Sequence, residues 1–190
     1  MCCRIKSETK RCAWACHVPE FYQKYHDEEW GKPLHDDIRL FEMLVLEGAQ
    51  AGLSWLTILK KREAYRKAFA GFKIAEVANF DTRKQEELLK NQGIIRNRLK
   101  IASAIKNAQI VLKIQQEYGT FDAYIWHFTG GRTMRFGIFP LPAHNALSDV
   151  VSKDMKKRGM KFVGSTIIYS YLQAIGVIDD HEPDCFLYHC

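Results

Sequence analysis

Residues 46–62, LEGAQAGLSWLTILKKR, carry the pattern that decides the fold. A carboxylate, Glu47, ends a run of apolar residues, and the small-residue loop 48–52 follows it directly. A second apolar segment begins at Trp55 and ends in the basic cluster 60–62. This pattern predicts two helices joined by a tight loop. Because a buried carboxylate without a partner is costly, Glu47 needs either a partner or a function. The simpler alternative is a helical hairpin with Glu47 at its rim.

The composition limits the class of protein. The chain has 190 residues, of which 47% are hydrophobic and 26% charged, as expected for one globular domain. Its formal net charge of +6 suits a polyanionic partner such as nucleic acid. No apolar run reaches the ~18 residues that a membrane span requires, and the charged N-terminus lacks a signal-peptide core. We therefore expect a soluble, cytoplasmic monomer with a flexible leader, 1–11, and a single helical domain, 12–190.

Helical periodicity and capping signals recur along the chain, without alternating strand pairs. The expected helices cover residues 19–25, 38–49, 55–69, 75–79, 83–90, 98–118, 121–127, 149–158 and 165–175. Ser148 is expected to cap the helix that begins at Asp149. The glycine- and proline-containing segment 129–147 is expected to be an irregular loop. The predicted fold class is all-α.

The turn 159–164 between the last two expected helices has the features of an anion site. Backbone N–H groups and the helix dipole favour an anion at the start of a helix. Four cations surround the turn: Lys156, Lys157, Arg158 and Lys161. One DNA phosphate, or two neighbouring ones, would fit this pattern. A plain helical hairpin in the core is the alternative, but it does not explain the four cations.

Cysteine and histidine residues gather at the two ends of the chain. Cys12 and His26 lie near the start, and His181 and Cys185 lie near the end. Two sulfurs and two imidazoles are a common ligand set for a closed tetrahedral zinc site. Further candidates are Cys16, His17, His189 and Cys190. Free buried thiols with a surface histidine are the alternative, so the spacing alone leaves the ligand set open.

Several long motifs match a known family. The matching segments are RCAW (11–14), YHDEEWG (25–31), LFEMLVLEGAQAGLSWLTILKKREAYR (40–66), GIIRNRLKI (93–101), SKDMKKRGMKFVG (152–164) and DDHEPDC (179–185). Through these motifs the chain resembles the 3-methyladenine DNA glycosylase I family of the helix-hairpin-helix superfamily. The resemblance extends over nearly the whole chain. It implies a helix-hairpin-helix glycosylase fold whose N- and C-terminal segments are joined by a zinc clip.

The resemblance also implies an activity and a set of site residues. Such an enzyme flips N3-methyladenine out of double-stranded DNA and hydrolyses its N-glycosidic bond, releasing the free base without strand cleavage. Glu47 corresponds to the catalytic, base-reading glutamate. The implied base-binding residues are Trp14, Tyr25, Trp30, Glu47 and Trp55. The implied DNA-binding residues are Gly52, Leu53, Lys161, Phe162, Val163 and Gly164. The implied ligands of a structural Zn²⁺ are Cys12, His26, His181 and Cys185.

The chemistry of the substrate agrees with such a site. Methylation at N3 places a positive charge on adenine and weakens its glycosidic bond. Aromatic faces bind a desolvated cation with ~1–2 kcal/mol per good contact. Most enzymes of the superfamily carry an aspartate after the hairpin, and this family is held to lack it, which leaves the role of the nearby Asp179 and Asp180 open. Two other functions compete: an inactive helix-hairpin-helix DNA-binding module, and a zinc-stabilised protein-interaction domain.

Overall fold

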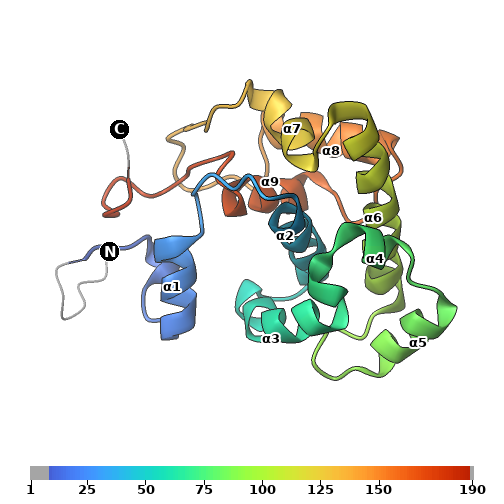
Figure 1. The fold of residues 1–190 in the computed structure, drawn as a ribbon. Helices are drawn as coiled ribbons and strands as arrows, with labels where there is room; N and C mark the ends of the chain where they lie inside the picture. The colour runs from blue at the N-terminus through green and yellow to red at the C-terminus, as the bar shows by residue number, and fades with distance from the viewer. Residues whose placement is uncertain (1–8, 189–190) are drawn as a thin grey trace.

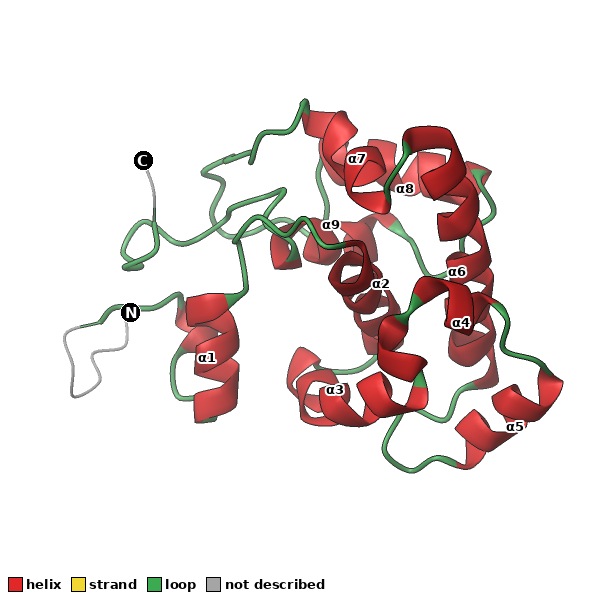
Figure 2. Cartoon of the chain, in the orientation of Figure 1, coloured by secondary structure: helices red, strands yellow, loops and turns green. Residues whose placement is uncertain are grey.

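The computed structural model describes residues 9–188, and these residues form nine α-helices connected by turns and loops (Figure 2). The α-helices are α1 (Glu20–Glu28), α2 (Asp37–Gln50), α3 (Trp55–Ala68), α4 (Ile74–Ala78), α5 (Thr82–Lys90), α6 (Arg98–Tyr118), α7 (Phe121–Trp126), α8 (Ala146–Lys157) and α9 (Ser165–Ala174). Short 3₁₀-helices cover Ala13–Ala15, Ala70–Phe72 and His127–Thr129. The described residues contain no β-strand, and one isolated bridge joins Met134 to Ile178. The predicted all-α class is confirmed.

Helix α2 lies at the centre of the molecule (Figure 1). Ten consecutive residues, 40–49, are buried, as expected for a helix that is covered on all sides. It packs against α3, α6, α7 and α9. Asp36 fixes the start of the helix, because its side chain accepts a hydrogen bond of 2.8 Å from the N–H of Arg39. The central helix thereby holds Glu47 at a fixed depth inside the protein.

The start of α8 differs from the prediction. The helix begins at Ala146, and its N-cap is Asn145. The Asn145 side chain accepts from the N–H of Ser148, while the Ser148 hydroxyl oxygen accepts from the N–H of Asn145. Ser148 is thus the partner of the cap and not the cap itself, so the expected boundary at Asp149 is wrong. These reciprocal bonds satisfy N–H groups that would otherwise lack a partner at the helix start.

The two ends of the described chain lie side by side, next to α1 (Figure 1). The N–H of Phe186 donates to the carbonyl of Lys10, and the Glu182 carboxylate accepts from the N–H of Ala13. Arg11 forms an ion pair of 2.7 Å with Asp27 of α1. Residues 1–8 of the expected leader lie outside the described residues, as do His189 and Cys190.

Helices α8 and α9 pack against each other and are joined by the turn 158–164. Across residues 9–188, every helix is either too short or too polar to cross a membrane.

Candidate functional site

Glu47 is buried in the middle of the central helix without a polar partner. It is 3% exposed, and its Oε2 has no hydrogen-bond partner among the described residues. Burial raises the pKa of Glu47 from 4.5 to about 8. The neighbouring Glu42, equally buried, instead accepts from Arg62 at 2.6 Å and from Arg66 at 2.9 Å. Glu42 is therefore a compensated structural carboxylate, whereas Glu47 keeps an acceptor available for a ligand.

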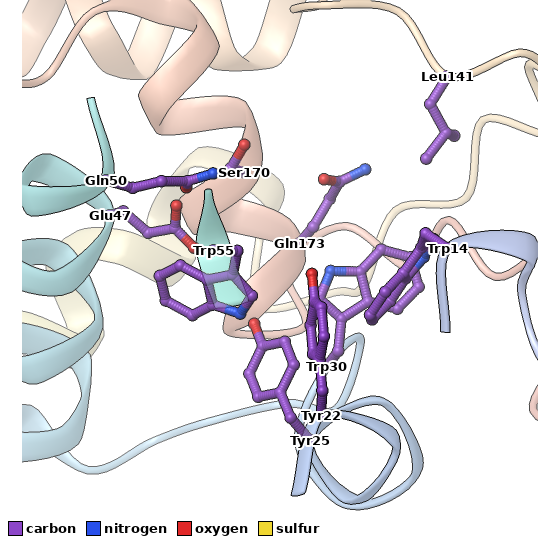
Figure 3. Close-up of a pocket in the computed structure, with 10 residues that line it drawn as sticks. All are labelled: Trp14, Tyr22, Tyr25, Trp30, Glu47, Gln50, Trp55, Leu141, Ser170 and Gln173. Atoms are coloured by element: carbon purple, nitrogen blue, oxygen red, sulfur yellow. The ribbon is translucent and has the colours of Figure 1, made fainter. Parts of the chain in front are cut away.

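The free oxygen of Glu47 belongs to the wall of a cavity of about 170 Å³ (Figure 3). The cavity is lined by Trp14, Tyr22, Tyr25, Trp30, Glu47, Gln50, Trp55, Leu141, Ser170 and Gln173. The five residues expected to bind the base are all in this set, so the structure brings them together from distant parts of the sequence. The cavity offers aromatic rings on several sides and a buried acid.

The aromatic rings of the cavity touch one another. Trp14 and Trp30 meet edge to face with 5.0 Å between their ring centroids, and Tyr25 lies 5.5 Å from Trp55. The Trp55 indole Nε1 is buried without a hydrogen-bond partner in the described part of the chain. A flat cationic ligand would gain cation–π contacts from these faces. Such rings do not form an ordinary core here, because they surround an open space.

Five lining residues are absent from the residues expected to bind the base: Tyr22, Gln50, Leu141, Ser170 and Gln173. Ser170 and Gln173 are one turn apart on α9, where they interrupt the apolar stretch that follows Ser165 and Thr166. That interruption is a signal that the sequence contains. Leu141 comes from the irregular segment 129–147, and nothing in its sequence context points to the cavity.

The loop between α2 and α3 is exposed, and a lysine of α6 binds the backbone at its start. Gly52 and Leu53 are both exposed, and Gly52 has a φ of +76°, which favours glycine. Lys100 Nζ of α6 donates to the carbonyls of Ala49 and Ala51, each at 2.7 Å. Desolvation lowers the pKa of Lys100. The loop that follows Glu47 therefore projects from a fixed base.

In the turn between α8 and α9, some backbone groups are already hydrogen-bonded within the protein. Asn107 accepts from the N–H of Lys161 and donates to its carbonyl, both at 2.9 Å. Within the described residues, the N–H groups of Phe162, Val163 and Gly164 make no hydrogen bond. These three donors remain available to an anion. Val163 is buried, so its side chain anchors the turn.

The four cations of the turn have different surroundings. Lys156, Lys157 and Lys161 are exposed. Arg158 instead donates to Asp154 at 2.7 Å and to Glu117 at 2.6 Å, and its guanidinium lies over the rings of Tyr118 and Tyr124. Arg158 is thus part of an internal network. Its place beside the turn in the sequence does not make it a phosphate contact.

A possible metal centre lies where the two chain ends meet. Ligand atoms of Cys12, His26 and Cys185 all lie within 4.8 Å of one another, and all three residues are buried. Cys16 does not belong to this group; its thiol lies 3.6 Å from the carbonyl of Cys12. The hydrogen bond between the two thiols lowers the pKa of Cys185 and raises the pKa of Cys12, so the pair shares one proton and supplies one thiolate without a metal.

The expected fourth ligand, His181, lies outside the group whose ligand atoms are all within 4.8 Å of one another, although its ring is 5.2 Å from that of His26. Its Nδ1 lies 2.6 Å from Asp179 Oδ1, while Nε2 is buried without a hydrogen-bond partner among the described residues. Metal-bound histidines usually pair their second nitrogen with a carboxylate in this way. A Cβ atom at Gly31 would lie 2.6 Å from His181 Cε1, so this position has room only for glycine. The residues present therefore fit a metal ion that prefers nitrogen and sulfur ligands.

The candidate metal-binding residues and the cavity share an aromatic wall. Trp30 lies 4.7 Å from the ring of His181, and Trp14 lies 5.1 Å from the ring of His26. Both tryptophans also line the cavity. The position of the imidazoles therefore sets the position of two cavity rings.

Known proteins resemble this chain over nearly its full length. The model of the methyladenine glycosylase family matches residues 14–188. DNA-3-methyladenine glycosylase 1 of Escherichia coli is 44% identical over 182 residues, which cover 94% of this chain and 97% of the relative. DNA-3-methyladenine glycosylase of Haemophilus influenzae is 40% identical, covering 93% of this chain and 97% of the relative.

Solved structures agree with these relatives. A crystal structure of 3-methyladenine DNA glycosylase I matches with a TM-score of 0.90 and 44% identity, over 94% of this chain and 100% of that chain. The 3-methyladenine DNA glycosylase I of Staphylococcus aureus, whose structure describes 3-methyladenine recognition, matches with a TM-score of 0.89 and 37% identity. That match covers 95% of this chain and 98% of the other.

Proposed function

Because the chain belongs to the methyladenine glycosylase family, we propose that Glu47 and the rings around it form the pocket in which this enzyme binds its damaged base. The protein is a base-excision repair glycosylase that removes 3-methyladenine from DNA. The observation that carries the pocket assignment is the buried, unpaired Oε2 of Glu47 in a cavity lined by aromatic rings.

The pocket complements a flipped, methylated adenine in two ways. The Glu47 carboxylate accepts from the exocyclic amine and balances the positive charge of the base. The rings of Trp14, Tyr25, Trp30 and Trp55 cover its faces. Removing a base from the stack costs a few kcal/mol, less for a damaged base, and the pocket contacts offset this cost. When Glu47 meets the cation, its pKa falls again, because an opposite charge replaces the lost hydration.

The reaction is a hydrolysis. The base leaves as neutral 3-methyladenine, so the leaving group needs little help from an acid. The residues that line the cavity include no lysine that could form a Schiff base with the sugar. The product is therefore free 3-methyladenine and an abasic site in an uncut strand. The acceptor at Glu47 contributes by holding the flipped base in the orientation in which its glycosidic bond breaks.

Double-stranded DNA is the proposed partner, and α8, the turn 158–164 and α9 are the proposed helix-hairpin-helix. The N–H groups of Phe162, Val163 and Gly164 would donate to phosphate oxygens, with Lys161 nearby. These groups lie at the N-terminus of α9, where the helix dipole favours an anion. Gly52 and Leu53 would fill the space that the flipped nucleotide leaves. The enzyme would act as a monomer in the cytoplasm, with 12–190 as one domain.

We assign zinc as the metal, with Cys12, His26, His181 and Cys185 as its ligands. Two sulfurs and two nitrogens suit zinc, and a closed set of four protein ligands leaves no position for a reactive water. The ion would supply a structural cross-link between the two ends of the chain. The buried Nε2 of His181, which lacks a partner among the described residues, supports its place in the set.

The Glu47→Gln variant tests the function. We expect it to keep the fold and general DNA affinity, but to lose excision by about ten- to a hundredfold, the effect of one charge-assisted hydrogen bond. Glutamine cannot balance the cation. The measurement is single-turnover release of 3-methyladenine from methylated DNA, with circular dichroism as the control for folding.

Two results would contradict this assignment. A wild-type rate with wild-type binding of the free base by the variant would show that Glu47 is structural. A wild-type protein that binds methylated DNA and releases no base would instead favour the inactive DNA-binding module.

A further inference from the structure

Asp180 lies directly behind the base pocket and holds one of its polar residues. It is 3% exposed, and its Oδ2 accepts two hydrogen bonds. One comes from the Tyr169 hydroxyl at 2.5 Å, and the other comes from Gln173 Nε2 at 2.8 Å. Gln173 in turn lines the cavity. The carboxylate therefore connects to the pocket through a single amide.

This contact fixes which amide atom faces the pocket. Asp180 Oδ2 accepts from both the Tyr169 hydroxyl and Gln173 Nε2, so the Gln173 side chain turns its nitrogen towards Asp180. Its carbonyl oxygen, Oε1, makes no hydrogen bond within the described residues. Figure 3 shows Gln173 pointing into the cavity, with the amide oxygen on the side of Trp55. The backbone of Gln173 is held as well, because its carbonyl accepts from the N–H of Gly31 at 2.9 Å.

We propose that Asp180 is a positioning residue that holds the Gln173 carbonyl towards the bound base, and that Gln173 thereby selects purines that carry an amino group. This inference rests on the proposed function of the pocket. Glu47 enters from α2 and Gln173 from α9, so the base meets acceptors from two helices. An exocyclic amine has two N–H donors and can satisfy both.

A purine with a carbonyl at the same edge would place its oxygen against the Gln173 carbonyl oxygen, which carries no proton in either state of Glu47. Buried acceptors that face each other without a proton between them are unfavourable, and a site built to accept an N–H strongly rejects an analogue that lacks it. A glutamine that was free to rotate could turn its NH₂ group to such a base and tolerate it. The fixed orientation set by Asp180 removes this possibility.

The test compares two free bases that differ in this exocyclic group and in one ring N–H, so the change of the ratio between variants, and not the ratio itself, is the readout. 3-Methyladenine carries an amine where 3-methylhypoxanthine carries a carbonyl. The tryptophans of the pocket report binding by fluorescence, and the ratio of the two dissociation constants measures the selection. In Asp180→Asn, the introduced amide can donate to Gln173 Oε1 and turn the Gln173 NH₂ towards the base. We expect the ratio to fall by about tenfold.

Two further variants separate orientation from general damage. Gln173→Met removes the acceptor without changing the segment next to His181, and the same fall of about tenfold is expected. With both changes together, the ratio should fall no further than with Gln173→Met alone. Tyr169→Phe removes the other hydrogen bond to the same carboxylate oxygen without reversing the amide. Its ratio should stay close to that of the wild type.

The outcomes are distinguishable. An unchanged ratio in Gln173→Met, or an equal fall in Tyr169→Phe, overturns the inference. Metal content is measured for each variant, and if Asp180→Asn loses metal, the comparison of Gln173→Met with Tyr169→Phe decides. Release of 3-methyladenine from methylated DNA by the wild-type protein is measured in parallel. Failure of that release would reject the proposed function, whatever the ratios of the free bases.

Discussion

Two buried glutamates on one helix show how burial alone fails to define a site. Glu42 and Glu47 are equally buried in α2, yet Glu42 receives two arginines and Glu47 none. The difference follows from helix geometry, because residues five apart point in different directions. Glu42 faces Arg62 and Arg66 of α3, whereas Glu47 faces the cavity. A buried carboxylate without compensation is costly, and a functional ligand is the simplest reason for it.

The raised pKa of Glu47 predicts how excision depends on pH. In the free enzyme this pKa is about 8, so below that pH the protonated form dominates and lacks the charge that the cation needs. We expect kcat/KM for excision, which reports the free enzyme, to rise by about tenfold per pH unit from the acidic side and to level off above the pKa. The substrate carries its charge at every pH, so the slope reports the enzyme.

The Glu47→Gln variant is the control for this profile. Its rate should be low and should change little over the same range, because glutamine does not titrate. Parallel profiles for the two proteins would mean that another group causes the pH dependence.

At the scale of the element, the loop between α2 and α3 depends on α6. Lys100 donates to two carbonyls at the C-terminal end of α2, where a cation is favoured. We expect Lys100→Met to reduce the stability by about 1–3 kcal/mol. We also expect it to lower excision from duplex DNA more than binding of the free base, because the loop is proposed to fill the duplex where the nucleotide has left it. Lys113→Met, an exposed change on the same helix, is the control. Equal losses in duplex excision and free-base binding would contradict the role of the loop.

The turn before α9 offers a test in which charge and folding are separated. Gly164 is the N-cap of α9 with a φ of −63°, and an added Cβ would meet no atom within 4 Å. Aspartate is a favourable N-cap, so Gly164→Asp should retain or improve the stability. Its negative charge should nevertheless weaken DNA binding by about tenfold or more and reduce the salt dependence.

Gly164→Asn is a matched variant, because asparagine also caps well but is neutral. It should keep more DNA affinity than the aspartate. If the curves of affinity against salt coincide for Gly164→Asp and the wild type, this turn is not the DNA-binding element.

Local signals predict the helices well where a cap and a periodic pattern coincide. Asp36 before α2 and Asn97 before α6 are such cases. The prediction fails at α8, because Asn145 and Ser148 are both capping residues and only the reciprocal bonds show which is the N-cap. The partners of Arg158 are likewise beyond the sequence. In the sequence, Arg158 is one of four cations near the turn, but its side chain is paired with acids on α6 and α8.

Some pocket residues could be predicted from the sequence and others could not. Trp55 and Glu47 are close in the sequence, and their motif predicts that they lie together. Gln173 acquires its meaning only from Asp180, and this contact depends on how the segment after α9 folds back. Side chains that act through a neighbour seven positions away in irregular structure leave no periodic signal.

At the scale of the whole molecule, the two ends of the described chain meet at the candidate metal-binding residues. Cys12 and Cys185 are separated by almost the full sequence, and the rings of the proposed ligands His26 and His181 lie 5.2 Å apart. A bound ion would therefore cross-link the N-terminal segment, α1 and the C-terminal segment. Because Trp14 and Trp30 pack on the two imidazoles, the cross-link would also fix one wall of the base pocket.

We predict that Cys185→Ser loses the metal, part of the stability and part of the affinity for 3-methyladenine. A metal present at about a thousandfold over its Kd stabilises by about 4 kcal/mol, so its loss should lower Tm by roughly 10 °C. Elemental analysis, thermal unfolding and fluorescence titration with the free base measure the three effects.

Cys16→Ser is the control, since Cys16 lies outside the group of ligand atoms. Its metal content and Tm should match those of the wild type. Wild-type protein purified without chelator and free of metal would refute the cross-link. Base affinity unchanged in a metal-free Cys185→Ser protein would show that the pocket wall stands without it.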